Sequence, residues 1–470
     1  MRYERRMRSF AAARLPSLLV SLSAVACSST TVTSAPAPAS APPVEVPASV
    51  DVYEGRPSTL EVSVVSEGGA PTVELSTEAA VEALAGEPRE ASPNTYRVAV
   101  TLRAAYGVAS GPLSVTVTDA RGGVETKTVQ LTAHHLGWKP SVTWAGQGGP
   151  PTREHGVFLL DKDATKAHLI QGSGYSPQWV PIADSWTLDL ATRTWSPLTL
   201  TGDLTAPMAG MRLAQAPGAA VGYMYGGYTG WADTEKTQED IYRVDPANAA
   251  KVVTRLQKQG DVSARYLHAF AYDADGDQLV GFGGFTNTPQ QDILVDAFSV
   301  KVSGDAAVFK TLATEGKKPE PRYGMFYAFD RESRRLVVFS GGQIPSATDP
   351  INAVNDVWTL DVASTPARWS AVAAAGTVPT GRRNGCSMHD PIGRRLFIFG
   401  GTRNGKTTED GLYVLSLEPG KETWTRLDLK DAPPLRSSGF GFSLPDGSVA
   451  CAFGNGASVY ADVNVLGYID

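Results

Sequence analysis

The chain has 470 residues, with 42 Lys and Arg against 48 Asp and Glu, and a formal net charge of −6. An acidic chain without a basic patch is a poor nucleic-acid binder, which excludes nucleic acid as an expected partner. After the first 26 residues no apolar run approaches the roughly 20 residues that a membrane-spanning helix needs, which excludes an integral membrane class.

Residues 1–26 are predicted to be a secretory signal. Residues 1–14 carry five Arg and one Glu, and the apolar stretch 15–26 is too short for a membrane span of roughly 20 residues. The segment ends in Leu22-Ser-Ala-Val-Ala-Cys27, which resembles a bacterial lipobox. The resemblance implies export by the general secretory route and a lipid on Cys27 that anchors the protein at the bacterial outer membrane or cell surface. Ordinary signal-peptidase cleavage is the alternative. Either cleavage leaves 37 basic and 47 acidic residues, a net charge of −10.

Residues 27–48 are rich in Ser, Thr, Ala and Pro and are predicted to be an extended tether. Residues 49–134 alternate apolar and polar side chains, and Asp119–Gly123 makes a tight connection between two such runs. Short alternating strands with turn signals predict a small β-sandwich. The run VTVTDARGGVETKTVQL resembles the end of a bacterial immunoglobulin-like or cadherin-like domain. The alternating apolar positions are Leu60, Val62, Val64; Tyr96, Val98, Val100, Leu102; Leu113, Val115, Val117; and Val129, Leu131.

Four Gly-Gly doublets recur at nearly even intervals in the rest of the chain. They are Gly226-Gly227, Gly283-Gly284, Gly341-Gly342 and Gly400-Gly401, spaced 57, 58 and 59 residues apart. Interrupted copies stand at Gly172–Gly174 and Gly454–Gly456. Each doublet ends a short apolar run, the pattern of a buried strand. A fixed period of this size indicates a repeat architecture, in which the loops carry function.

Each unit has the same order: an Arg, the Gly-Gly strand, an Asp that opens a third strand, and a large residue that closes a fourth. Four short antiparallel strands repeated about six times predict a β-propeller. The pattern resembles the kelch repeat over residues 138–470, which implies an all-β, six-bladed kelch-type propeller. The opening Asp residues are Asp184, Asp240, Asp296, Asp356, Asp410 and Asp462, and the closing residues are Trp195, Phe309, Trp369 and Trp424, with only Val252-Val253 in the second unit.

The last unit stops after its third strand, so its fourth strand must come from elsewhere. The segment just before the first unit contains Trp138 and Trp144 and is predicted to supply it, which would remove both open edges of the propeller. The spacing to Arg153 favours Trp138 as the closing residue, but both remain candidates. The predicted domains are thus the sandwich at 49–134 and the propeller at 135–470.

No motif for a metal, cofactor or nucleophile stands out, and we expect no cofactor, no metal and no catalytic residue. Cys386 and Cys451 could pair across neighbouring blades, but we expect two small buried apolar residues instead. The pair His134-His135 is expected to be a solvated linker. An enzyme is the alternative function: some kelch propellers are similar to galactose oxidase or act on sugars, yet neither Cys here sits in a matching setting.

The loops after each Gly-Gly and the Arg that opens each unit are predicted to share one propeller face. Arg side chains bind carboxylates, while Trp and Tyr side chains pack against sugar rings or against the apolar side chains of a protein partner. We therefore predict an envelope-anchored, monomeric binding scaffold for a protein partner or a polysaccharide. The predicted ligand-binding residues are Arg153, Tyr175, Trp179, Arg212, Tyr228, Trp231, Arg265, Phe285, Arg322, Gln343, Arg382, Arg403 and Arg436.

Overall fold

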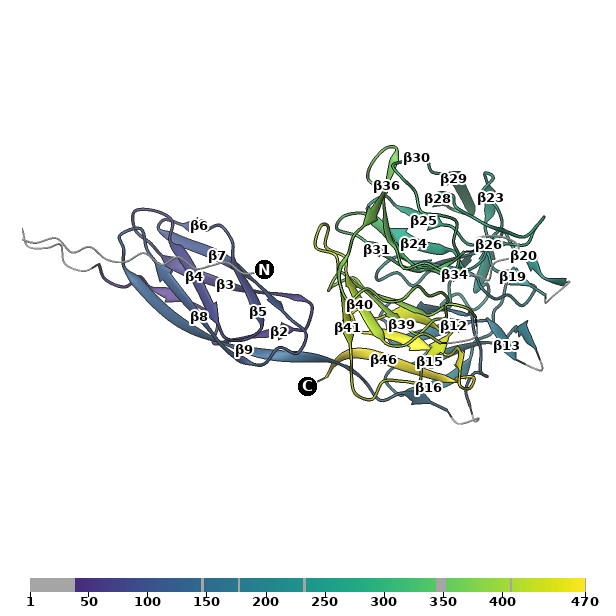
Figure 1. Cartoon of the computed structure of the whole chain (residues 1–470), viewed down its shortest axis with the longest axis horizontal. Coiled ribbons are helices and arrows are strands. Elements are labelled where there is room, and N and C mark those ends of the chain that lie inside the picture. Colours follow the sequence, from purple (N-terminus) through teal and green to yellow (C-terminus); the bar gives the residue numbers. More distant parts are fainter. Residues whose placement is uncertain are drawn as a thin grey trace, which may run out of the picture.

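A computed structural model of the chain describes residues 39–144, 148–175, 178–230, 234–343, 352–405 and 408–469 (Figure 1). The elements are all β-strands, as predicted. They form an elongated N-terminal module (residues 39–134) and a larger repeat domain (residues 135–469), joined side by side. Among the described residues no helix is long and apolar enough to cross a bilayer. The predicted signal and Cys27 lie outside the described residues.

The N-terminal module consists of two sheets that share one core. Alternate residues of each strand point into that core, among them Val62, Val100 and Val115, which are fully buried. The alternation arises because successive side chains of a strand face opposite sides. One sheet has the order β1-β3-β7-β5, with β6 beside β7; the other runs β4-β8-β9, with β2 parallel to β9. The strands are β1 (Val44–Glu45), β2 (Ser49–Tyr53), β3 (Pro57–Val65), β4 (Thr72–Thr77), β5 (Val81–Ala85), β6 (Arg89–Ser92), β7 (Thr95–Ala104), β8 (Gly111–Thr118) and β9 (Val124–Trp138).

The connection between the two parts is a single continuous strand, which differs from the predicted solvated linker at His134-His135. Strand β9 pairs with β8 of the module and then, from His135 to Trp138, with the last strand of the chain. His134 stacks on Tyr53 at 4.6 Å, and His135 Nδ1 lies 2.8 Å from Glu54 Oε1. Strand β1 also begins inside the segment predicted as a tether. In both segments, contacts with apolar and aromatic side chains stabilise a strand despite the polar composition.

Six sheets of similar order follow one another in the repeat domain, each with a Gly-Gly strand next to its innermost strand. The first five contain β11 (Val157–Leu160), β12 (Lys166–Ile170), β15 (Ser185–Asp189), β16 (Thr194–Pro197); β17 (Arg212–Gln215), β18 (Gly222–Tyr225), β21 (Ile241–Val244), β22 (Val253–Arg255); β24 (Ala269–Asp273), β25 (Gln278–Phe282), β28 (Ala297–Ser303), β29 (Ala306–Thr311); β31 (Phe326–Asp330), β32 (Arg335–Phe339), β35 (Val357–Asp361), β36 (Ala367–Val372); and β38 (Cys386–Asp390), β39 (Arg395–Phe399), β40 (Leu412–Ser416), β41 (Thr423–Leu427).

The sixth sheet contains strands from both ends of the repeat domain. It consists of β43 (Phe440–Ser443), β44 (Val449–Ala452), β46 (Asp462–Ile469) and the end of β9. Trp138 pairs with Leu466 there, as Trp424 pairs with Leu415 and Trp369 with Leu360 in the earlier sheets. Trp138 therefore takes the place of the closing residue, whereas Trp144 follows the short strand β10 (Val142–Thr143) and packs on Trp195.

A closed ring of six backbone hydrogen bonds links the inner edges of these sheets. Each N–H in the ring donates to the carbonyl of the preceding unit, at 2.8–3.3 Å for the five longer bonds. All six residues have left-handed backbones with φ between 54° and 69°. This conformation is unfavourable for residues other than Gly, so the ring itself holds them in place. In order the residues are His155, Gly210, Leu267, Gly324, Asn384 and Ser438.

Cys386 and Cys451 form a disulfide, which corrects the expectation of two unpaired buried residues. The bond joins β38 of the fifth sheet to β44 of the sixth, and the two Cα atoms are 5.6 Å apart. The sequence offered this pairing only as the alternative, because the two Cys are 65 positions apart and are brought together by a full repeat. The sheet that contains both ends of the repeat domain is thus covalently tied to its neighbour.

Short hairpins extend from the ends of the Gly-Gly strands on the side opposite the N-terminal module (Figure 1). They are the structural basis of the loop face that the sequence predicted. The described hairpin strands are β13 (Ser173–Tyr175) with β14 (Trp179–Pro181), β19 (Tyr228–Thr229) with β20 (Lys236–Thr237), β26 (Phe285–Thr286) with β27 (Asp292–Ile293), and β33 (Gly342–Gln343) with β34 (Asn352–Ala353). In the last unit β42 (Arg436–Ser437) pairs with β45 (Asn455–Gly456), although β43 and β44 lie between them in the chain.

Candidate functional site

Five of the predicted ligand-binding arginines are completely buried instead of lining an exposed ring. Arg322, for example, is 0% exposed, donates to both oxygens of Asp356 at 2.6 and 3.1 Å, and donates to the carbonyl of Ser340. Each of these guanidinium groups ties the start of a unit to its Gly-Gly strand and to the residue that opens its third strand. These guanidinium groups bond to the backbone or side chains of their own units and are fully buried, so a ligand at the surface cannot reach them. The five are Arg153, Arg265, Arg322, Arg382 and Arg436.

Arg212 does not occupy the same position in its unit as these five arginines. This corrects the predicted alignment of the second unit with the others. The carbonyl of Met208 accepts a hydrogen bond from Gly172, just as the carbonyl of Arg265 accepts one from Gly227. Met208, which is 2% exposed, therefore occupies the position of the repeat arginine. Arg212 stands four residues later, and its Nε donates to the carbonyl of His268 at 3.1 Å. A nearby Arg was mistaken for the repeat residue because Met breaks the motif.

The residue directly after each repeat Arg position lies opposite the residue that follows one glycine of each unit, the glycine whose N–H donates to the repeat Arg or Met208 carbonyl of another unit. Antiparallel bridges hold these residues in pairs, so both side chains of a pair point the same way. We call this set the axial surface. Its pairs are Glu154 with Ser173, Ala209 with Tyr228, Tyr266 with Phe285, Tyr323 with Gly342, Arg383 with Thr402, and Ser437 with Asn455.

One half of the axial surface is aromatic. Tyr228 packs on Tyr266, Tyr266 on Phe285, and Phe285 on Tyr323, with ring centroids 5.0, 5.2 and 5.4 Å apart. Tyr266 is partly exposed and donates its hydroxyl to Glu235 Oε1 at 3.0 Å. Burial raises the pKa of Glu235. The predicted residues Tyr228 and Phe285 belong to this half.

The other half is polar. Glu154 accepts a hydrogen bond from Asn455 Nδ2 at 2.6 Å, and Ser437 Oγ lies 2.8 Å from Asn455 Oδ1. Burial raises the pKa of Glu154 to about 7, although hydrogen bonds from Ser438 and Asn455 lower it. The guanidinium of Arg383 lies over Tyr323, 5.1 Å from the ring centroid, where the two halves meet. Tyr266, Arg383 and Asn455 are partly exposed, and the other aromatic and polar residues of the set lie buried directly beside them.

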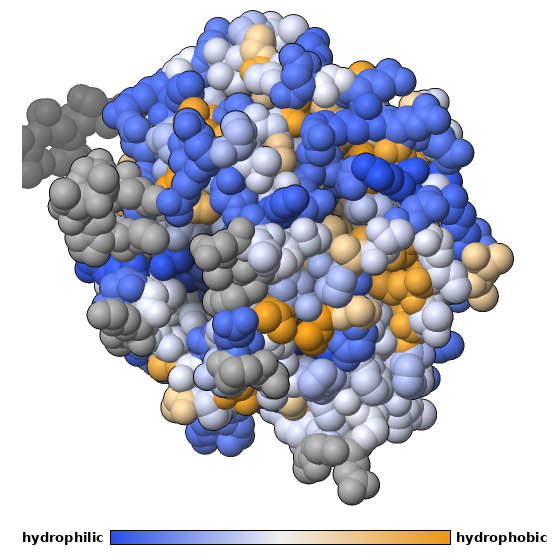
Figure 2. All heavy atoms as spheres, turned by 90° about the vertical axis from the view of Figure 1, so that its right-hand side faces the viewer, coloured by the Kyte–Doolittle hydropathy of each residue, from blue (hydrophilic) through white to orange (hydrophobic). Residues whose placement is uncertain are grey.

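Rim hairpins rise around the axial surface and carry the remaining predicted residues. Tyr175 is 56% exposed, and its ring packs edge-on against Trp179 at 5.6 Å. Gln343 is partly exposed and Arg403 is exposed, while Trp231 lies outside the described residues. Figure 2 looks onto this side of the molecule and shows hydrophobic groups near its middle among hydrophilic ones.

Sequence reasoning missed Glu154, Tyr266, Tyr323 and Arg383. A usable signal existed, because each of them directly follows a repeat Arg. The Arg itself was the more conspicuous residue, yet its regular recurrence reflects its role inside every unit. The side chains at the next position vary from unit to unit; Tyr266 and Arg383 are partly exposed, whereas Glu154 and Tyr323 are buried.

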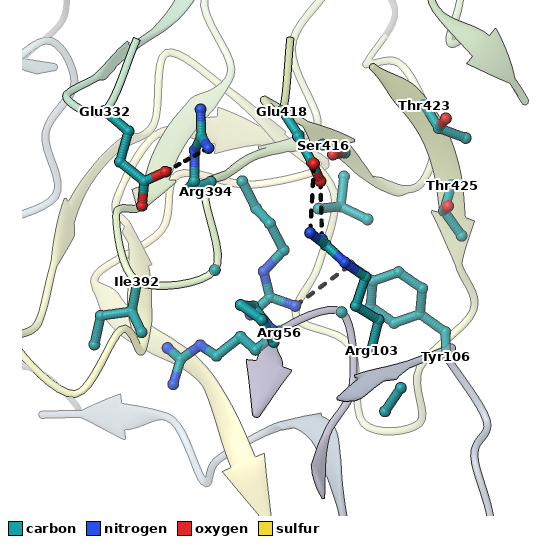
Figure 3. Close-up of a pocket in the computed structure, with 16 residues that line it drawn as sticks. Arg56, Arg103, Tyr106, Glu332, Ile392, Arg394, Ser416, Glu418, Thr423 and Thr425 are labelled. Carbon is teal, nitrogen blue, oxygen red and sulfur yellow. Dashed lines mark hydrogen bonds and ion pairs between the residues drawn. The ribbon is translucent and has the colours of Figure 1, made fainter. Parts of the chain in front are cut away.

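A hollow of about 290 Å³ lies between the N-terminal module and the repeat domain (Figure 3). Arg103 of the module donates to both oxygens of Glu418 at 2.8 and 3.3 Å, and Arg394 pairs with Glu332. The remaining two arginines of its lining, Arg56 and Arg395, share a carboxylate. Every guanidinium in this lining has a carboxylate partner, so we interpret the hollow as part of a polar joint between the two parts.

Within the part of the chain that the structure describes, no three His, Cys, Asp or Glu side chains are grouped so that they could hold a metal ion. Both described cysteines are in the disulfide, so neither is available for the Tyr–Cys crosslink of a galactose-oxidase-like site. The expectation of no cofactor remains a prediction.

Comparisons with known proteins agree with the repeat pattern. The KLHDC2/KLHL20/DRC7 Kelch-repeats domain matches residues 220–390 and 291–468, which together are just over half of the chain. N-(sulfonatooxy)prop-2-enimidothioate sulfolyase of Thlaspi arvense is 27% identical over 280 residues, 56% of this chain and 74% of that protein. Putative adagio-like protein 2 of Oryza sativa subsp. japonica is 26% identical over 189 residues, 38% of this chain and only 29% of that protein. The solved structure of YjhT covers 69% of this chain and 99% of its own, with 14% identity and a TM-score of 0.49.

Proposed function

Because the chain belongs to the kelch-repeat family, we propose that it is a binding scaffold that holds its ligand on the axial surface of a β-propeller. The observation that carries the proposal is the division of this surface into an aromatic half and a polar half, on the side that faces away from the N-terminal module. Sugars present apolar ring faces and hydroxyl groups together, and they match such a surface. The exposed Tyr175 and its partner Trp179 extend it outward. A polysaccharide is therefore the favoured ligand, ahead of a protein partner.

The proposed architecture that presents this surface has six blades, an immunoglobulin-like sandwich and a lipid anchor on Cys27 in the bacterial envelope. The ring of six backbone hydrogen bonds and the pairing of β9 with β46 support a closed six-bladed propeller. The two sheets over one core support the sandwich. The lipobox resemblance supports the anchor. In this arrangement the binding side points away from the membrane tether.

A sugar-modifying enzyme is the second candidate, and Glu154 is the specific observation for it. A carboxyl group whose pKa is raised to about 7 by burial is poised to give and take protons near neutral pH. The sulfolyase from Thlaspi arvense is named for a lyase reaction, so a similar chain has enzymatic activity. Turnover of a bound glycan that is lost in Glu154→Gln would favour this candidate.

The test is a glycan-array screen of the protein that lacks residues 1–38, which contribute none of the described elements. Beside it we would screen Trp179→Ala and the control Tyr96→Ala, which changes a partly exposed aromatic residue of the N-terminal module. We expect glycan hits that Trp179→Ala weakens and Tyr96→Ala leaves intact. An absence of hits contradicts a polysaccharide ligand and directs the search to a protein partner through crosslinking on whole cells. Hits that are equal in all three proteins contradict binding on the axial side.

A further inference from the structure

Arg383 is a cation on the axial surface without a counter-ion. No carboxylate of the described residues lies within ion-pair distance of its guanidinium, and its Nε is buried without a hydrogen-bond partner. Arg322 and Arg395, by contrast, are each paired with an Asp. A partly buried guanidinium is costly to leave unpaired. Its free donors therefore need either water or an anionic partner from outside the chain.

The position of Arg383 is fixed before any ligand arrives. Its backbone N–H and carbonyl both bond to Thr402, at 2.9 and 2.8 Å. Gly342 makes room for its side chain, because a Cβ at that position would lie 2.6 Å from Arg383 Cδ and 2.9 Å from Tyr323 Cε1. The guanidinium lies over the ring of Tyr323 and makes a cation–π contact with it. A held, planar guanidinium is suited to a bidentate contact with a carboxylate.

The surroundings of Arg383 are electrostatically positive. His155 lies close to both Arg383 and Arg212, and burial together with these two positive charges lowers the pKa of His155 to about 3. Both ring nitrogens of His155 and the Oδ1 of Asn384 are buried without partners. Arg212, like Arg383, has no carboxylate within ion-pair distance among the described residues; its Nε donates to a backbone carbonyl. Glu154, the acidic side chain among the axial pairs, bonds to Asn455 and not to an arginine.

We propose that Arg383 binds a carboxylate of the ligand, so that the glycan held on the axial surface is an acidic one with uronic acid units. This inference rests on the proposed function, because it names the chemical class of ligand for the same surface. The guanidinium of Arg383 can bind one carboxylate of the ligand. The neighbouring aromatic residues and the amide of Asn455 then contact the sugar ring and its hydroxyl groups.

The test compares acidic oligosaccharides with their carboxyl-reduced forms on one array, using the wild type, Arg383→Met and Arg331→Met. Arg331 is an exposed arginine beside Glu332, on the side of the repeat domain that meets the N-terminal module, and serves as the matched control. Loss of one charged hydrogen-bond partner weakens binding by roughly tenfold or more. We expect that loss on carboxyl reduction and in Arg383→Met, with Arg331→Met unchanged. Equal binding of acidic and reduced forms, or full binding by Arg383→Met, overturns the inference while the scaffold proposal stands.

A second measurement does not depend on finding the right glycan. The melting temperature is recorded in acetate and in chloride at equal ionic strength, for the same three proteins. A bound anion stabilises the folded state, so acetate should raise the melting temperature of the wild type and of Arg331→Met, but not that of Arg383→Met. If acetate acts alike on all three proteins, Arg383 is not an anion site, whatever the array shows. If only the array is negative, the polysaccharide proposal fails and the anion site remains.

Discussion

The two ends of the repeat domain differ in whether their charged side chains are paired with side chains of opposite charge. At the joint with the N-terminal module, Asp390 accepts hydrogen bonds from both Arg56 and Arg395, and Arg103 is paired with Glu418. On the axial surface, Arg383 and Glu154 have no partner of opposite charge among the residues that the structure describes. Paired charges hold a structure together, whereas unpaired ones are retained at a cost in stability and point to a ligand. The contrast separates the structural end of the domain from its functional end.

The largest loss of stability is expected from Asp390→Ala at the joint. Its carboxylate is fully buried and bonded to two guanidinium groups, so its removal leaves two cations unpaired. A buried pair broken in this way costs about 3–5 kcal/mol in the free energy of unfolding. Urea denaturation measures the change, with Glu332→Ala as an exposed control on the same side. A loss no larger than that of the control contradicts the structural role of the joint.

The pH dependence of Asp390 follows from the same contacts. Burial alone would raise the pKa of Asp390, but the charges of Arg395 and Arg56 and the hydrogen bonds lower it below its ordinary value. A group with a lowered folded pKa contributes stability above its unfolded pKa, and that contribution is lost as the pH falls. The joint should therefore weaken in acid.

Glu154→Gln should give the next largest effect, with the opposite dependence on pH. The folded pKa of Glu154 is about 7 against an ordinary 4.5, so the folded protein keeps a proton that the unfolded chain has released. Its contribution is fully present below pH 4.5 and is lost as the pH rises through 7. At pH 8 the wild type has lost about 3 kcal/mol of its free energy of unfolding in this way. The Gln variant does not lose it, because its side chain stays neutral. Melting curves from pH 5 to 8 would test this, and parallel curves for the two proteins would contradict it.

Arg322→Met should change the free energy of unfolding by less than either of these substitutions, since the chain already carries Met208 at the same position of another unit. Asp356, the partner of Arg322, is 40% exposed and can be hydrated once the arginine is gone. We expect a loss of about 1–3 kcal/mol, from the range for charged hydrogen bonds. Arg331→Met removes an exposed pair with Asp275 and serves as the control, at about 0–1 kcal/mol. Equal losses in the two variants would show that burial of the repeat arginine is unimportant.

The sequence was informative about the repeats and misleading about the site, for one physical reason. Features that most units share, such as the glycine pair and the buried arginine, recur with the period and are easy to find. Their recurrence predicted the kelch-type β-propeller, which the family match confirms. The residues that differ between units, such as Arg383 and Glu154, do not recur. Their position after the repeat arginine was a usable signal, but only the bridges of the structure show which residues they pair with.

The partners across long sequence distances were also beyond prediction. The contact of Arg56 with Asp390 joins residues 334 positions apart, and no local pattern encodes it. The disulfide between Cys386 and Cys451 depends on how two neighbouring sheets align. Trp138 was favoured by spacing alone, and its pairing with Leu466 supplies the physical reason.

Trp179→Ala should have the smallest effect on stability and still weaken ligand binding. Its ring contacts the exposed Tyr175 on a rim hairpin that lies outside the cores of the sheets. Surface substitutions of this kind change the free energy of unfolding by about 0.5 kcal/mol or less. Trp424→Ala, which removes a ring that is 1% exposed, is the matched control and should cost about 3–5 kcal/mol. If thermal unfolding shows similar losses for the two variants, Trp179 is a core residue, and the rim must be removed from the binding surface.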